Sequence, residues 1–161
     1  MGKIVEVLLD EIYCFHREDS KTNRCISIPL KEKFDALEFI CSYTPKALSD
    51  ETEAKRLIET GIAVYVPPEY IGQYGIWRDY LPVVNLLTLS IDYNETYVGC
   101  AHRHAPEQRH IISAGFSSPG FLKQPALAGN WRAVINVHAV VSNEVQYRLQ
   151  VHAHSGSIEN N

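Results

Sequence analysis

Most of the chain consists of short segments in which apolar and polar residues alternate, which is the pattern of half-buried β-strands. Residues 35–45 (DALEFICSYTP) show this pattern well. The even-numbered residues from 36 to 42 would lie on one face of the strand, and the odd-numbered residues from 37 to 43 on the other. Further strands are predicted for residues 3–16, 25–30, 83–92, 96–104, 109–116, 130–141 and 145–154, and the first of these is also compatible with a helix.

One segment has helical spacing instead. Apolar residues recur between Ala54 and Ile62 at intervals of three and four, Ser49 or Asp50 can cap the start, and Pro67-Pro68 must end the helix. Residues 69–82 are aromatic and irregular, and we expect a long ordered connection there.

These elements predict a mainly β fold, an antiparallel β-sandwich of jelly-roll type with one helix in a long connection. An α+β fold is the alternative. We expect a single sandwich domain over residues 1–154 and a flexible tail or linker stub over residues 155–161.

Composition narrows the function classes. The 161 residues are 45% hydrophobic, enough for the core of one domain, and the formal net charge is −4 without a basic stripe, so we expect no nucleic-acid partner. Acidic residues interrupt the apolar start too early for a signal peptide, and no segment is long enough to span a membrane, which predicts a cytoplasmic protein. The four cysteines show no C-x-x-C spacing and are expected to be reduced.

Residues 99–111 (GCAHRHAPEQRHI) hold three of the seven histidines. If residues 97–104 and 109–116 form a hairpin, His104 lies opposite His110 and His102 opposite Ile112. Imidazoles two residues apart on a strand have Cα atoms about 6.5–7 Å apart, so a zinc site of His102, His104 and His110 is one hypothesis. The other is a core histidine at position 102 with the remaining two half-exposed at the loop.

The same end of the predicted sandwich carries convergent charged and imidazole groups, which is typical of a ligand-binding site. The candidate ligand-binding residues are Arg103, His104, Glu107, Arg109 and His110. No cofactor is required by this site, and zinc or another divalent metal is the alternative.

A second His-x-His, His152-Ala153-His154, is similar to the opening metal motif of PHP-type phosphoesterases. Only seven residues follow it. A multi-metal site needs far more chain, so we expect no catalysis from this motif.

The order of motifs over about residues 25–151 resembles the N-terminal β-domain that precedes the catalytic domain in CehA/McbA-type PHP metallohydrolases. The resemblance is carried by the opening IPL…FDALEFICSYTPK and by NLLTLSIDYNETYVGCAHRH, HIISAGFSSPGF, ALAGNW and VQYRLQV. In that family the metal-binding catalytic residues belong to the following domain, so none is carried over to this chain.

The resemblance implies a non-catalytic accessory module that binds a small ligand or a PHP-type catalytic domain, either free-standing or part of a larger enzyme. Two alternatives stay open. One is a small metal-dependent hydrolase in which a metal on His102, His104 and His110 activates water and Glu107 is the base. The other is a purely structural partner of a separately encoded enzyme.

Overall fold

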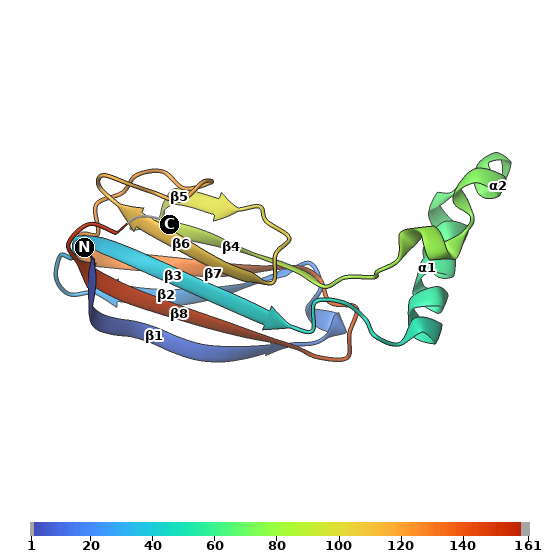
Figure 1. Cartoon of the computed structure of the whole chain (residues 1–161), viewed down its shortest axis with the longest axis horizontal. Helices are drawn as coiled ribbons and strands as arrows, with labels where there is room; N and C mark the ends of the chain where they lie inside the picture. Colours follow the sequence, from blue (N-terminus) through green and yellow to red (C-terminus); the bar gives the residue numbers. More distant parts are fainter. Residues whose placement is uncertain (1, 159–161) are drawn as a thin grey trace.

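Two four-stranded antiparallel sheets pack face to face in the computed structural model of the chain, which describes residues 2–158 (Figure 1). The first sheet contains, in spatial order, β1 (Lys3–Phe15), β8 (Val145–Ser155), β3 (Ala36–Thr44) and β6 (Glu107–Ser113). The second sheet contains β2 (Thr22–Leu30), β7 (Gly129–Ala139), β4 (Leu86–Tyr93) and β5 (Thr96–Ala101). The mainly β prediction is confirmed, and the α+β alternative is not realised.

Alternation places one face of each strand in the core between the sheets. In β3 the predicted division into two faces is confirmed, and the odd positions Leu37, Phe39, Cys41 and Tyr43 belong to the core. Trp131 on β7 is fully buried there, and its indole N–H donates to the Leu127 carbonyl at 3.0 Å. The even positions of β3 therefore face outward from the first sheet.

The connections give the jelly-roll topology of two interlocked Greek keys. Only β4 and β5 are joined as neighbours within one sheet, and every other connection carries the chain from one sheet to the other.

The hairpin predicted from residues 97–104 and 109–116 is wrong for this reason. β5 pairs with β4 in the second sheet, whereas β6 pairs with β3 in the first, so the intervening residues 102–106 cross between sheets. Both segments are strands with alternating patterns, and alternation does not reveal which strand pairs with which.

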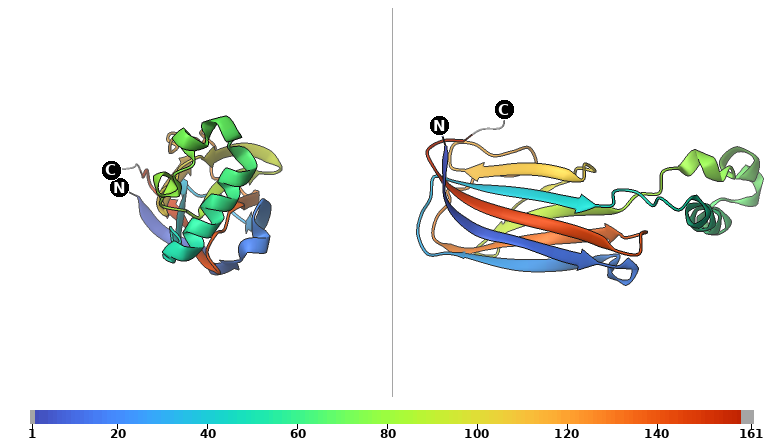
Figure 2. Two further views of the ribbon diagram at one scale, coloured as in Figure 1. Left: turned by 90° about the vertical axis from the view of Figure 1, so that its right-hand side faces the viewer. Right: turned by 60° about the horizontal axis from the view of Figure 1, so that its bottom comes forward.

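Between β3 and β4 the chain forms a helical arm, residues 45–85, that extends away from one end of the sandwich (Figures 1 and 2). It contains α1 (Glu51–Tyr65), η2 (Pro68–Tyr70), α2 (Ile71–Tyr74) and η3 (Trp77–Tyr80). The predicted helix is confirmed, and the Asp50 side chain accepts from the Glu53 backbone N–H at 3.1 Å as its N-cap. The segment predicted as an irregular connection consists of the short helical turns after α1.

Asn85 fixes the base of the arm to the sandwich. Its buried side-chain amide donates to the Pro45 carbonyl at 3.0 Å and to Ser142 Oγ at 2.8 Å, and its side-chain oxygen accepts from the Val141 N–H at 2.7 Å. The Asn85 N–H donates to the Lys46 carbonyl at 2.9 Å. The two ends of the arm thus leave the sandwich side by side.

The chain after β8 is ordered as far as it is described. β8 continues to Ser155, one residue past the predicted domain end at 154, and Ile158 is buried against Ala36 and Ile111 on the outer face of the first sheet. Gly2 adjoins it, since a Cβ added there would lie 1.5 Å from Ile158 Cγ2. The predicted tail over 155–161 therefore does not apply to residues 155–158, and residues 159–161 lie outside the described part.

Candidate metal centre

Three side chains that can ligate a metal meet on the outer face of the first sheet. Glu38 on β3 pairs directly with His152 on β8, and His154 pairs with Ala36, two positions away from Glu38 on the same strand face. Because residues of equal parity share a strand face, both imidazoles and the carboxylate point the same way. Ala153, which lies between the two histidines, and Val151, which precedes them, belong to the core instead.

The carboxylate of Glu38 is the centre of this cluster. Its Oε1 accepts from Nδ1 of His152 at 3.2 Å and from Nε2 of His154 at 3.1 Å. Its Oε2 accepts from Nε of Arg109, which reaches over from β6. We refer to Glu38, His152 and His154 as the Glu-His-His cluster.

The cluster is buried although it lies on an outer face. Glu38 is 5%, His152 9% and His154 5% exposed. A small hydrophobic group of Ala36, Ile111 and Ile158 adjoins it and limits the access of water. In such a setting electrostatic interactions are stronger than in water.

The surroundings decide the charge of Glu38. Burial would raise the pKa of its carboxyl, but the hydrogen bonds from Arg109, His154 and His152 outweigh burial and lower the pKa below its ordinary value. The group is therefore ionised at neutral pH and can only accept hydrogen bonds, which places a proton on Nδ1 of His152 and on Nε2 of His154. The other ring nitrogen of His154, Nδ1, is buried without a hydrogen-bond partner among the described residues.

The donor atoms fit a metal ion. Within residues 2–158 this is the one group of three His, Cys, Asp or Glu side chains whose ligand atoms all lie within 4.8 Å of one another. In a tetrahedral zinc site with bonds of 2.0–2.1 Å the ligand atoms are about 3.3 Å apart, close to the two nitrogen–oxygen distances of the cluster. Zinc would take the place of the two histidine protons, while Arg109 on the other oxygen would orient the carboxylate.

The structure does not bring together the three histidines of the predicted zinc site. His102 and His104 are exposed in the crossing between β5 and β6, and His110 is buried on β6 with its ring 5.1 Å from that of Phe121. His110 faces the core because it pairs with Phe39, whereas His102 and His104 lie beyond the end of β5. No group of ligands that contains them is found within the described range.

Burial, followed by the positive charge of Arg103, lowers the pKa of His110 to about 4. The imidazole is therefore neutral near pH 7. Its Nε2 lies 2.8 Å from Oε1 of Gln108, and its Nδ1 has no hydrogen-bond partner among the described residues.

The five candidate ligand-binding residues are also separated. Arg103 and His104 are exposed in the crossing and His110 is in the core, while Glu107 and Arg109 lie on the outer face of the first sheet. There they line a shallow hollow of about 410 Å³ together with Ser42.

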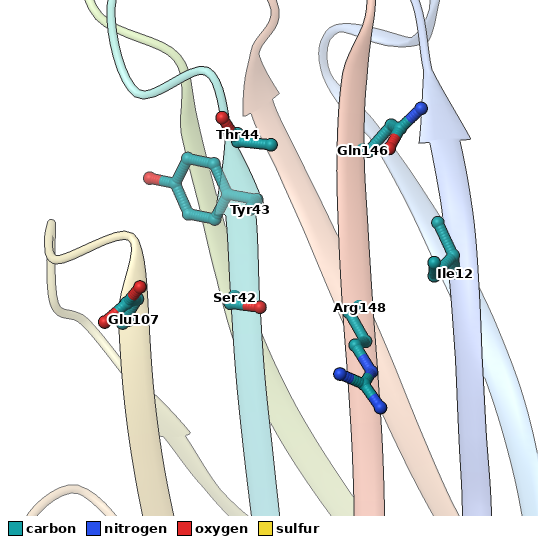
Figure 3. Close-up of a pocket in the computed structure, with 7 residues that line it drawn as sticks. All are labelled: Ile12, Ser42, Tyr43, Thr44, Glu107, Gln146 and Arg148. Carbon is teal, nitrogen blue, oxygen red and sulfur yellow. The ribbon is translucent and has the colours of Figure 1, made fainter.

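A neighbouring hollow of about 230 Å³ shares Glu107 and Ser42 with the first. Figure 3 shows its lining coming from all four strands of the sheet, with Ile12 on β1, Arg148 on β8, Ser42 on β3 and Glu107 on β6. Arg148 is held by Asp10, to which it donates at 2.8 and 2.9 Å. Both hollows are open to solvent.

The density of histidines in the sequence does not point to Glu38. One signal was available in the sequence: an acidic residue inside the apolar strand 36–44, at a position facing away from the core. His152 and His154 were recognised as a metal-like motif, but their partner on β3 is more than a hundred residues away along the chain and only the fold brings it near.

No helix in the described part of the chain is both long and apolar enough to cross a membrane.

Comparison of the chain with protein-family models, with curated proteins and with solved structures gives no match. The resemblance to the β-domain of CehA/McbA-type metallohydrolases therefore stays a prediction.

Proposed function

We propose that the chain is a non-catalytic jelly-roll module that binds a divalent metal ion, with zinc the best suited, at the Glu-His-His cluster. As the resemblance suggests, such a module would accompany a PHP-type metallohydrolase domain. The observation that carries metal binding is the meeting of Glu38, His152 and His154 in one buried site with ligand atoms at the spacing of a tetrahedral centre.

The ligand chemistry supports zinc. Two imidazole nitrogens and one carboxylate oxygen form a set typical of zinc, and hard ions such as magnesium prefer oxygen ligands. Both histidines are on one rigid strand and Glu38 is on its hydrogen-bonded neighbour, so the ligands are held before metal arrives. Metal binding then requires little ordering of the chain.

The charge around the cluster indicates what would complete the coordination. One carboxylate and two neutral imidazoles supply a single negative charge, so a divalent ion bound by these three ligands keeps a net positive charge. An anionic oxygen, either hydroxide or a carboxylate of a bound ligand or partner, is therefore the favoured fourth ligand.

A metal-dependent hydrolase is the second candidate. It is favoured by the three-ligand set, since catalytic zinc sites keep the fourth position for water. Catalysis also needs a base close to that water. Glu107, the base expected from the sequence, pairs with Ser42, four positions along β3 from Glu38, which is a separation of about 13 Å. The geometry therefore supports binding better than hydrolysis.

Metal analysis of the untagged chain tests the proposal. After purification and incubation with zinc followed by gel filtration, plasma mass spectrometry should find close to one zinc per chain. Substitution of cobalt(II) should give the intense visible absorption of tetrahedral coordination. Both signals should be lost in Glu38→Gln and in the double variant His152→Ala/His154→Ala.

The chain supplies a matched control in His102→Ala/His104→Ala, which removes the same two side chains from the other His-x-His. It should retain full zinc content. Substoichiometric zinc in the folded wild type, or loss of zinc only in this control, would overturn the proposal. The remaining hypothesis would then be a purely structural partner of a separately encoded enzyme.

A further inference from the structure

The helical arm exposes a concentration of apolar and aromatic side chains. Tyr65 is 84% exposed, and Tyr70, Ile71, Tyr74, Ile76 and Tyr80 are each between 43% and 53% exposed. Tyr70 and Tyr74 lie against each other with ring centroids 6.3 Å apart, and Tyr80 donates from its hydroxyl to the Tyr74 carbonyl at 2.7 Å. Tyr70, Tyr74 and Tyr80 therefore lie together, and Tyr80 also lines a hollow with Tyr65.

The arm has almost no core of its own. In the fully described segment 51–80, only Ala54 and Ile62 of the helix α1 are buried, and η2, α2 and η3 contain no buried residue. Helix α1 packs mainly against η3, and the whole arm points away from the sandwich (Figure 2). Ordering a segment of this length has a high entropic cost, which so little burial does not offset.

The exposed face of α1 is shaped for a close neighbour. Ile58, Gly61, Ile62 and Tyr65 follow one another at helical spacing and line, with Val66 and Tyr80, an apolar hollow of about 340 Å³. A Cβ added to Gly61 would meet nothing within 4 Å, so no contact inside this chain requires glycine there. Glycine in the middle of a helix is destabilising by about 1 kcal/mol relative to alanine, and close approach of another backbone is a common reason for accepting that cost.

The charges select the kind of neighbour. Residues 60–68 (TGIAVYVPP) carry no charge, and residues 45–85 hold six Asp and Glu residues against four Lys and Arg residues. An anionic membrane surface or nucleic acid requires Lys and Arg, whereas a neutral apolar face can meet an identical face without repulsion between like charges.

We infer that the chain forms a two-fold symmetric dimer in which the α1 helices of two copies cross at Gly61. In an isologous interface the same patch serves both copies, and here one arm supplies both a hollow and protruding aromatic side chains. At about 150–250 Å² per tyrosine, the four tyrosines, which are 44–84% exposed, offer roughly 350–550 Å², about half of the ~800 Å² per partner that a standard interface buries. Exposed tyrosines are typical of such interfaces.

The oligomeric state of the full chain tests this inference. Sedimentation velocity and light scattering between about 5 and 200 µM, the range in which interfaces of this size associate, should give a concentration-dependent dimer. Gly61→Leu should weaken the dimer at least tenfold, because the new side chain blocks the helix crossing, while its Cβ has no atom of its own copy within 4 Å. Tyr65→Ser should weaken it to a similar degree.

Tyr97→Ser is the matched control, since Tyr97 is 57% exposed on β5, outside the arm, and its loss should leave association unchanged. Gly61→Ala should raise the melting temperature of the dilute, monomeric chain while weakening the dimer. A wild type that is monomeric at the highest concentration, or a Gly61→Leu variant as dimeric as the wild type, would overturn the inference and assign the arm to a different protein. All measurements are made in chelator, so that they do not depend on the metal site.

Discussion

The chain contains His-x-His twice, and the two pairs have opposite surroundings. His102 and His104 lie in the exposed crossing between β5 and β6, without a carboxylate beside them. His152 and His154 lie within a central strand of the first sheet, buried, with the Glu38 carboxylate between them and Arg109 behind it. Equal spacing in the sequence thus gives a candidate metal site in one case and two separate surface side chains in the other. The neighbouring strand makes the difference, because it holds the third donor at a fixed register.

The largest effect should come from removing that third donor. In chelator, Glu38→Ala should lower the free energy of unfolding by about 3 kcal/mol, because it leaves the buried imidazole N–H groups of His152 and His154 without their acceptor. Urea denaturation measures this directly. Glu107→Ala removes an exposed carboxylate from the same sheet and should change stability by less than about 0.5 kcal/mol. Similar losses in the two variants would mean that the cluster is not a distinct site.

Metal should separate the two histidine pairs. Zinc at about 100 times its dissociation constant should stabilise the wild type by about 2.7 kcal/mol, which corresponds to a rise in melting temperature of roughly 5–10 °C for a chain of this size. The His102→Ala/His104→Ala variant should show the full rise by calorimetry, and chelator should reverse it. The same rise in melting temperature with zinc in the His152→Ala/His154→Ala variant as in the wild type would show that this pair does not bind the metal.

His110, the third histidine of the predicted zinc site, should make the free energy of unfolding depend on pH. His110 has its pKa lowered to about 4 from an ordinary value of 6.5, so between these values the unfolded chain binds a proton that the folded chain does not. Its contribution to stability is present above pH 6.5 and is lost as the pH falls toward 4, amounting to about 2 kcal/mol between pH 7 and pH 5.

Unfolding free energies of the wild type and His110→Gln across this range measure the effect. The variant should have the flatter pH dependence. Parallel curves for wild type and His110→Gln would show that this histidine is not buried in its neutral form.

The smallest effects belong to the exposed pair. His104→Ala should alter the free energy of unfolding by less than about 0.5 kcal/mol, as is usual for surface substitutions. Diethylpyrocarbonate should modify His102 and His104 rapidly and His152 and His154 slowly, which peptide mass mapping can resolve. Equal modification rates would contradict the difference in burial between the pairs.

Much of the fold could be predicted from local patterns. The alternation in residues 36–44 fixed which side chains of β3 enter the core, and the capping residue Asp50 and the proline pair 67–68 bounded α1 within two residues. Strand pairing could not be predicted in this way. The sequence neighbours β5 and β6 belong to different sheets, while β1 and β8, from opposite ends of the chain, lie side by side.

The same limit applied to the site. The sequence shows that His152 and His154 share a strand face, but the identity of the residue opposite them depends on the register between β3 and β8. That register is set by packing over the whole sheet and not by any residue near the histidines. The predicted group of His102, His104 and His110 depended on the predicted hairpin, which paired β5 with β6. Because these two strands belong to different sheets, the three histidines do not meet.

The way in which the helical arm joins the sandwich would allow it to be replaced without changing the strands. Its two ends leave the sandwich side by side, bridged by the pairing of Ala47 with Val84 and anchored by Asn85 to the turn between β7 and β8. A short turn between Thr44 and Leu86 could therefore take its place without altering the register of either sheet. Related sandwiches could gain, lose or exchange such an arm while keeping their strands, so that the candidate metal centre and the proposed association surface would be free to diversify independently.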